Sequence, residues 1–311
     1  MRLPLPLACI ALFGLAGPVA AEPTPVPDVA RGAVATPAVV RIGVESEPGD
    51  RRFDFAAQLL EGALRHAGST ARVERVRGMS QPRMIQSARD GRLDVLMLPS
   101  TSAGDVGLRH IPFPLRRGLL GVRLLLARPD DAPAIARVAS LQALKRDYVL
   151  GYGQGWLDRQ SLESLGFRME LASSYRGLFD MLRGGRFDYL SRGVSELHAE
   201  LADPRLAGSG MVVVPGIALF KPLDDFFFIP VGRRALHGDI ERGLQAMLAD
   251  GSYDRLLAAH YGEAMRAAGI EDREILHVVG YPVPLGTPLE HFDILTPVRS
   301  RALLRAPGVD P

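Results

Sequence analysis

The spacing of hydrophobic residues switches repeatedly between the period of strands and that of helices. Residues 39–44 form a short run rich in β-branched side chains, typical of a buried strand. In residues 55–66 the apolar side chains recur at helical spacing, as at Leu60 and Leu64, and Gly68 follows as a stop signal. The same criteria predict next a strand, a helix and a strand, at residues 72–76, 82–89 and 93–98. This order predicts a parallel sheet with helices on its faces.

The same order of elements begins again in the second half of the chain. Strands and helices alternate there, at residues 148–151, 158–165, 169–171, 175–182 and 187–190. Residues 87–96 resemble residues 181–190, since in both a helix ends on Gly and an Arg–apolar–Asp triplet leads into a strand. Gly-Arg-x-Asp alone is a common helix-to-strand turn, so the order of the surrounding elements carries the inference. We predict an α/β protein with two similar lobes.

Beyond the second lobe, the pattern predicts a strand at residues 226–231 and helices at residues 239–248 and 253–261. Residues 263–311 are rich in Pro and Gly and contain a strand-like run at residues 275–279. We expect this C-terminal tail to pack on the surface.

The N-terminus has the three parts of a secretory signal peptide. Met1 and Arg2 give a positive start, residues 3–15 are largely apolar, and small residues precede Glu22. We predict cleavage after Ala21, so that residues 1–21 are the signal peptide, and a flexible leader at residues 22–38, which contain several prolines. Two alternatives remain, a lipoprotein modified at Cys9 and a membrane anchor, although the apolar run is shorter than the ~20 residues that span a bilayer. We expect a periplasmic protein.

Composition narrows the class of protein. The 311 residues are 47% hydrophobic and 23% charged, as in an ordinary globular protein of about two domains. Because 37 basic residues face 35 acidic ones, the chain lacks the basic excess of a nucleic-acid binder, and we expect no nucleic-acid partner. A single Cys cannot form an internal disulfide.

The motifs of common enzymes are absent from the sequence. It contains no Gly-x-Ser-x-Gly elbow, no His-Glu-x-x-His pair and no phosphate-binding Gly-Lys-Ser/Thr loop. The seven His are scattered without the spacing of a metal site. We therefore expect no catalytic residues, no cofactor and no metal ion.

From residue 39 to residue 262 the chain resembles the periplasmic solute-binding proteins of family 3, the polar amino-acid type. The matching segments are residues 42–44 (IGV), 91–95 (GRLDV), 151–155 (GYGQG), 185–188 (GRFD) and 249–255 (ADGSYDR). The resemblance implies the type II periplasmic-binding-protein fold, with two α/β lobes joined by a two-strand hinge that close over a small solute. It also implies crossings near residues 127–130 and 223–227. Lobe 1 would then comprise residues 39–127 and 226–262, lobe 2 residues 128–225, and the tail residues 263–311.

Candidate ligand-binding residues follow the predicted strands, because ligands of open α/β sheets bind beyond the carboxyl ends of strands. They are Glu45, Ser46, Ser100, Thr101, Ser102, Tyr152, Gln154, Gly155, Trp156 and Arg192. The Gly153–Gly155 turn precedes a helix and offers backbone N–H groups to an anion. Arg192 could pair with an acidic ligand or with Glu196, and Trp156 could stack on a ligand or pack under the helix. The serines, the threonine and the glycine turn could equally be ordinary turn residues.

Two departures from the family bear on the ligand. Asp105 stands where the family has the Arg that holds an α-carboxylate, and Gly193 stands near the position of the Asp that holds an α-amino group. We therefore predict that the ligand is not an ordinary α-amino acid held in the usual way. Arg116 and Arg117 could also reach the cleft, and we expect at least one of them to be solvated.

These observations favour an extracytoplasmic solute-binding protein that delivers a small polar solute, with an anion among the candidates, to an ABC importer. The alternatives are a protein of the same fold that presents its ligand to a membrane sensor, and an enzyme in which Glu45 acts as a general acid or base. The expected partners are the solute and an ABC permease or membrane sensor, and we expect a monomer.

Overall fold

The computed structural model describes residues 38–44, 54–99, 107–156, 158–197, 210–284 and 286–296. The predicted signal peptide and the leader, apart from Ala38, lie outside these residues. None of the helices in the described ranges combines the length and hydrophobicity needed to cross a membrane.

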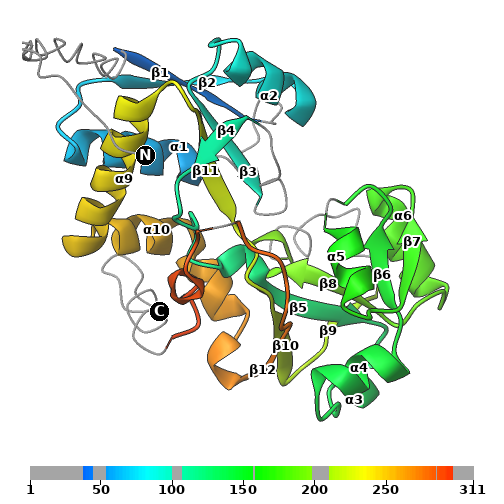
Figure 1. Ribbon diagram of the computed structural model, residues 1–311. Coiled ribbons are helices and arrows are strands. Elements are labelled where there is room, and N and C mark those ends of the chain that lie inside the picture. The colour runs from blue at the N-terminus through cyan, green and yellow to red at the C-terminus, as the bar shows by residue number, and fades with distance from the viewer. Residues whose placement is uncertain are drawn as a thin grey trace, which may run out of the picture. The chain divides into compact units, whose positions relative to one another are not determined.

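The first sheet has the strand order β2-β1-β3-β11-β4 (Figure 1). Its strands are β2 (Arg72–Val76), β1 (Val39–Gly43), β3 (Val95–Pro99), β11 (Asp225–Pro230) and β4 (Leu108–His110). Strand β1 runs parallel to β2 and β3, whereas β11 runs antiparallel to β3 and β4. A strand from late in the chain therefore lies between two early strands.

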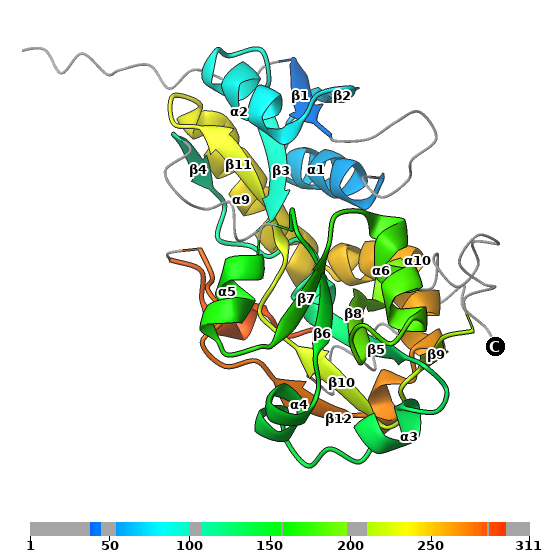
Figure 2. The ribbon, with the colours of Figure 1, turned by 90° about the vertical axis from the view of Figure 1, so that its right-hand side faces the viewer.

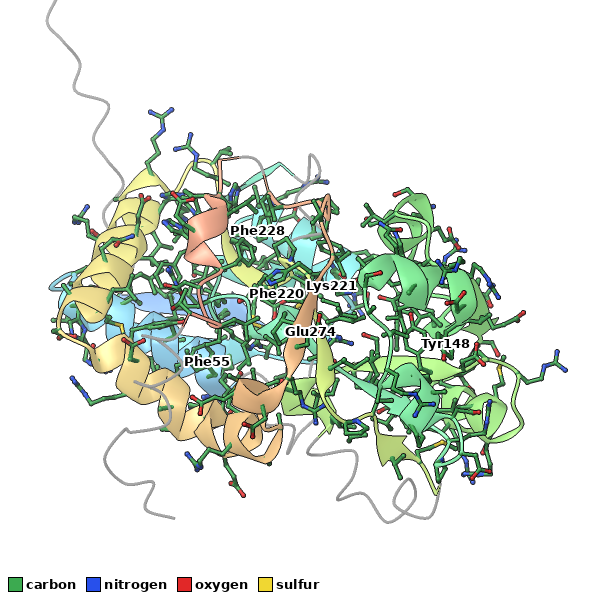
Figure 3. The ribbon with its side chains drawn as sticks, turned by 90° about the horizontal axis from the view of Figure 1, so that it is seen from below. Phe55, Tyr148, Phe220, Lys221, Phe228 and Glu274 are labelled. Atoms are coloured by element: carbon green, nitrogen blue, oxygen red, sulfur yellow. The ribbon has the colours of Figure 1, made fainter. Side chains whose placement is uncertain are left out.

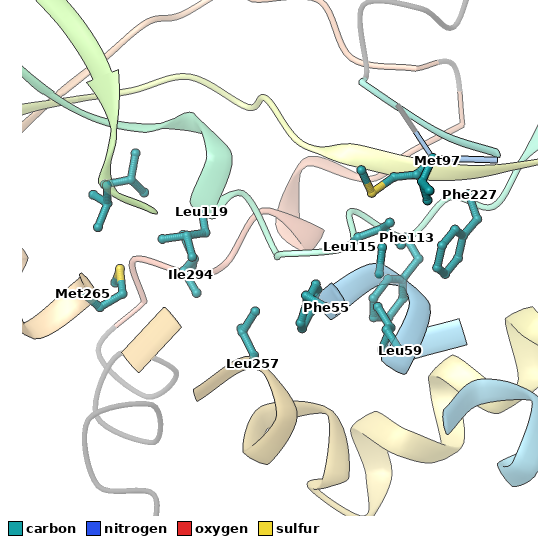
Figure 4. Packing of buried hydrophobic residues seen from close by; sticks show 14 of the residues in the cluster. Phe55, Leu59, Met97, Phe113, Leu115, Leu119, Phe227, Leu257, Met265 and Ile294 are labelled. Atoms are coloured by element: carbon teal, nitrogen blue, oxygen red, sulfur yellow. The ribbon is translucent and has the colours of Figure 1, made fainter. Parts of the chain in front are cut away.

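Helices cover both faces of this sheet. The helices of this half are α1 (Asp54–His66), α2 (Gln81–Arg89), α9 (Arg234–Ala249) and α10 (Ser252–Ala267). Because successive strand residues point to opposite faces, Val95 and Met97 pack in the cluster of α1, whereas Leu96 and Leu98 pack in the cluster of α2. Phe227 lies on the α1 side, together with Leu59 (Figure 4).

The second sheet has the order β12-β10-β5-β8-β6-β7, and β9 pairs with β5. Its strands are β12 (Glu274–His277), β10 (Ile217–Phe220), β5 (Val122–Ala127), β8 (Tyr189–Gly193), β6 (Leu150–Gly153), β7 (Met169–Ala172) and β9 (Val212–Val213). The helices along this part of the chain are α3 (Ala132–Ile135), α4 (Leu141–Asp147), α5 (Arg159–Ser164) and α6 (Tyr175–Arg183). Figure 2 shows α5 and α6 flanking β6 and β7.

The repeated helix-to-strand turn has the same geometry in both lobes. Gly91 and Gly185 adopt the left-handed backbone conformation, with φ of 74° and 69°. Asp94 donates its backbone N–H to the Arg41 carbonyl at 2.9 Å, and its carboxylate accepts the Arg41 N–H at 2.9 Å. Asp188 makes the same two bonds to Val149, at 2.9 and 2.6 Å. The repeat that the sequence predicted is therefore also present in the three-dimensional structure.

The structure places the start of the second lobe earlier in the chain than the sequence predicted. Residues 122–127 were expected in lobe 1, but β5 pairs antiparallel with β8 and β10 in the second sheet. The chain therefore crosses at residues 111–121, earlier than the predicted 127–130, and returns at residues 221–224. All six residues of β5 are buried, so the strand has no solvent-exposed face to mark its lobe.

The tail is more than the surface cover that its composition predicted. The strand-like run at residues 275–279 is confirmed as β12, which pairs in parallel with β10 at the edge of the second sheet. Further along, Ile294 is fully buried in the main hydrophobic cluster. The tail is thus part of the folded core.

The two crossovers touch through their backbones. Lys221 donates its N–H to the Gly121 carbonyl at 3.1 Å, and a Cβ at Gly121 would lie only 1.7 Å from the Lys221 carbonyl oxygen. A glycine is therefore required where the outgoing and returning segments meet. Lys221 follows Phe220, the last residue of β10 (Figure 3).

Asp224 links the same two crossovers. Its carboxylate accepts the backbone N–H groups of Arg116 at 3.0 Å and Gly118 at 2.6 Å. Arg116 in turn forms an ion pair with Asp225, and its Nε donates to the Tyr261 hydroxyl at 2.9 Å. Burial raises the pKa of Asp224 to about 7. A carboxylate of the return segment thus holds the backbone of the outgoing one.

Candidate ligand-binding site

The candidate ligand loop, residues 153–156, leaves the carboxyl end of β6. Gln154 donates its N–H to the Ala172 carbonyl at 2.9 Å, and Trp156 donates its N–H to the Gly153 carbonyl at 3.1 Å. These backbone donors are therefore engaged, unlike the free N–H groups predicted for an anion. The following helix, α5, has six residues. Gln154 and Gly155 are exposed, so the tip of the loop remains accessible.

Tyr152 and Trp156 form an edge-to-face aromatic pair at the root of this loop. Their ring centroids are 4.5 Å apart at an interplanar angle of 85°. The indole ring lies against Gly153, where a Cβ would be 2.7 Å from ring atoms. Trp156 is half-buried and packs against both large hydrophobic clusters, which confirms the packing alternative for this residue.

Arg192, on β8, is brought to the same place. Its guanidinium carbon lies 5.3 Å from the ring centroid of Trp156 and 5.3 Å from that of Tyr175. The side chain is 7% exposed, and its Nη2 lies 3.7 Å from Glu196 Oε2. The structure therefore unites Tyr152, Trp156 and Arg192 and confirms the ion pair with Glu196.

Glu196 is shared between two arginines. Arg123 Nη1 lies 3.1 Å from Glu196 Oε2, and Arg123 Nη2 donates to the Ser191 carbonyl at 2.8 Å. Burial opposes ionisation of Glu196, but Arg123 and Arg192 outweigh it and lower its pKa to about 2. The carboxylate is thus ionised and engaged by guanidinium groups.

The absence of a side chain at Gly193 leaves room for the Glu196 carboxylate. The Gly193 N–H donates to Glu196 Oε2 at 2.8 Å, and a Cβ at this position would lie 2.8 Å from the same oxygen. Position 193 itself carries no carboxylate, as the sequence indicates, and the carboxylate that lies beside it belongs to Glu196. Because two arginines engage it, this carboxylate is a poor partner for a ligand ammonium group.

Asp158, which follows the loop in the chain, binds the side chains of three other residues. Its Oδ1 accepts the Tyr152 hydroxyl at 2.5 Å, and its Oδ2 accepts the Tyr281 hydroxyl at 2.8 Å. Lys221 Nζ completes the cluster as an ion pair with Oδ2. Burial opposes ionisation of Asp158, but Lys221 and the hydroxyl donors lower its pKa to about 2. Burial lowers the pKa of Lys221 to about 8, and Asp158 limits this drop.

Sequence patterns did not identify several residues of this site. These residues are Arg123, Asp158, Tyr175, Glu196 as a shared carboxylate, Lys221 and Tyr281. Arg123 lies on β5, Asp158 and Tyr175 lie at the starts of α5 and α6, Glu196 follows β8, and the other two belong to a crossover and the tail, so no local motif joins them. The scarcity of lysine was the only available signal for Lys221, since the chain holds just Lys145 besides it.

The expectation that Arg116 or Arg117 is solvated is wrong. Arg116 is buried against Asp225, and Arg117 forms a two-pronged ion pair with Asp293 at 2.8 Å for both nitrogens. Both arginines lie in a crossover, where carboxylates from later segments cover them.

Half of the candidate residues have no described position. The five candidates Glu45, Ser46, Ser100, Thr101 and Ser102 lie outside the residues that the structure describes, and so does Asp105. Their contact with a ligand stays a prediction. Within the described ranges, no group of three or more His, Cys, Asp or Glu side chains is placed to hold a metal ion.

Comparison with known proteins identifies the fold. No family model and no curated protein sequence matches the chain. Among solved structures, it is similar to the VFT2 domain of Bordetella pertussis BvgS, a double mutant, with a TM-score of 0.52, 16% identity and coverage of 72% of this chain and 93% of that one.

A second similar structure is the second substrate-binding domain of a Streptococcus pneumoniae protein described as an amino acid ABC transporter. Its TM-score is 0.50 at 13% identity, and the alignment covers 71% of this chain and 99% of that one. The strand orders and these likenesses agree: the chain has the fold of the type II periplasmic binding proteins, two α/β lobes joined by paired crossovers.

Proposed function

We propose that the protein is an extracytoplasmic solute-binding protein that closes over a small anionic solute and delivers it to an ABC importer. The observation that carries the proposal is Arg192, buried at the carboxyl end of β8 between Trp156 and Tyr175. Aromatic rings lie over this guanidinium, so a ligand would meet its N–H edge, which suits a carboxylate or another planar oxyanion.

The charges around Arg192 support an anion over a cation. Arg123 stands beside it, and the nearest carboxylate, Glu196, is engaged by both guanidinium groups. A cationic solute would meet two positive charges without an available carboxylate among these residues. The site therefore favours a small acid that lacks an ammonium group beside its carboxylate.

The rest of the proposal concerns location and mechanism. The signal-peptide pattern of residues 1–21 supports export, and the crossovers supply the hinge for closure between an open and a closed form. Ligand would bind one lobe and contacts from the other would stabilise the closed form. The chain acts as a monomer without enzymatic turnover.

A second candidate function is presentation of the ligand to a membrane sensor. The chain is similar to the BvgS domain with a TM-score of 0.52 and to the transporter domain with a TM-score of 0.50, so its fold is compatible with either function. Both functions need the same closing cleft. A purified complex with a permease would favour import, and one with a sensor kinase would favour signalling.

The decisive experiment identifies the ligand. The full chain is exported from a bacterial host and purified, and small molecules released by denaturation are identified by mass spectrometry. Calorimetry then measures their affinity for the ligand-free protein. We expect an organic anion, and we expect Arg192→Ala to weaken its binding at least about tenfold, or 1.4 kcal/mol.

Arg186→Ala is the matched control, because Arg186 is an exposed arginine of the same lobe. Its affinity should equal that of the unmodified protein. Tight binding that survives Arg192→Ala would contradict the site, and micromolar binding of a common L-amino acid would contradict the ligand class. Failure to bind any small anion would overturn the function.

A further inference from the structure

The carboxylate of Asp158 joins three segments that are far apart in the chain. Tyr152 precedes the candidate ligand loop, Lys221 begins the return crossover, and Tyr281 belongs to the tail. The partners from the crossover and the tail are 63 and 123 residues away from Asp158 in sequence. All four side chains are buried, and Lys221 Nζ also lies 5.1 Å from the Tyr281 ring centroid. The base of the loop is thus held by side chains of the return crossover and of the tail.

The tail continues from Tyr281 to the outgoing crossover. Asp293 binds the Arg117 guanidinium with both oxygens, and Ile294 donates its N–H to the Arg117 carbonyl at 3.0 Å. His291 Nδ1 lies 3.0 Å from the Pro112 carbonyl oxygen. The tail therefore makes two sets of contacts: it binds the outgoing crossover at Pro112 and Arg117, and it binds Asp158 through Tyr281.

Arg117 shows that this contact constrains the crossover. It has a positive φ of 55°, the only such non-glycine residue within the described part of the chain. A residue other than glycine is strained in this conformation, which persists only where its surroundings hold it. Here the tail holds both the carbonyl and the guanidinium of Arg117, so the backbone of the crossover depends on the tail.

We propose that Asp158 is a positioning residue for the ligand loop, and that the C-terminal strap, residues 278–284 and 286–296, sets the loop against the crossovers through it. The strap ends at Asp158 on one side and at Arg117 on the other. Loosening either end frees the Tyr152–Trp156 pair and weakens the closed form. This inference rests on the proposed function for its link to ligand, but the strap itself can be tested without any ligand.

Trp156 is the only tryptophan of the chain, so its fluorescence reports on the loop alone. The experiment compares the full chain with Tyr281→Phe and Asp158→Asn by acrylamide quenching of Trp156, at a temperature where circular dichroism shows all proteins folded. Tyr281→Phe removes one hydroxyl from the Asp158 cluster. We expect the quenching constant to rise about twofold in both variants, because local opening exposes the indole.

Tyr148→Phe is the matched control, since Tyr148 is a half-buried tyrosine of the same lobe outside the Asp158 cluster. It should leave quenching unchanged. Asp293→Asn tests the far end of the strap and should raise quenching in the same direction. Unchanged quenching in folded Tyr281→Phe overturns the proposal, even where Asp158→Asn fails to fold. A normal strap with no bound anion would instead count against the proposed function alone.

Discussion

Asp94 and Asp188 occupy equivalent positions in the two lobes, and each forms the same pair of hydrogen bonds to the backbone of a single residue in the neighbouring segment. Asp94 binds both backbone groups of Arg41, and Asp188 binds both backbone groups of Val149. In the first lobe these bonds join the turn after a helix to β1, and in the second lobe they join it to the residue directly before β6. The Asp of the repeated motif therefore sets how the two strands are placed against each other.

Replacing these aspartates should destabilise the fold, and more strongly in the first lobe. Asp94 is 1% exposed and also lies 3.2 Å from Arg233 Nη2, so Asp94→Ala leaves buried groups without partners. We expect a loss of about 2 kcal/mol for Asp94→Ala and about 1 kcal/mol for Asp188→Ala in urea unfolding. Asp180→Ala, at an exposed site, should stay within about 0.5 kcal/mol of the unmodified protein. Equal stability of all three variants would contradict this role.

Gly121→Ala tests the contact between the crossovers. Because the new Cβ would lie 1.7 Å from the Lys221 carbonyl oxygen, the backbones must separate. We expect a loss of about 3 kcal/mol, measured by urea unfolding. Gly155→Ala provides the control, since no atom lies within 4 Å of the position of its Cβ. A variant at position 121 as stable as the one at position 155 would disprove the backbone contact.

Tyr189→Phe should leave stability unchanged or raise it by about 1 kcal/mol. The Tyr189 hydroxyl is buried and has no hydrogen-bond partner among the described residues, so removing it takes away a desolvated polar group. Tyr152→Phe, in contrast, should lower stability because that hydroxyl donates to Asp158. Thermal unfolding of both variants checks the sign. A marked loss for Tyr189→Phe would reveal a partner for its hydroxyl.

Stability should respond to pH through Lys221. Burial lowers the pKa of this lysine from 10.5 to about 8, so between these values the unfolded chain binds more protons than the folded one. Stability from this group therefore rises with pH across that window. We expect the free energy of unfolding of the unmodified protein to rise relative to Lys221→Met between about pH 8 and 9.5, below the range in which tyrosines ionise. Parallel curves for the two proteins would show that Lys221 has an ordinary pKa.

Several elements could be predicted from the sequence because their signal is local. The helical spacing of Leu60 and Leu64 identified α1, and the left-handed Gly91 and Gly185 marked the helix ends that precede β3 and β8. Strand β5 was assigned to the wrong lobe, because a run buried on both faces looks the same in either sheet. Within the site, local position placed Trp156 and Arg192 at strand ends, which the structure brings together.

The sequence by itself determined the alternation of strands and helices, the duplicated turn and the strand ends where a ligand would bind, because each depends on residues a few positions apart. Only the tertiary structure decided that Arg117 is covered by Asp293 and that Asp158 meets Lys221 and Tyr281. Those pairs are separated by dozens of residues or more, and hydrophobic periodicity carries no information on which distant charges will be buried together. Their partners follow from how the strands are ordered and where the tail crosses them.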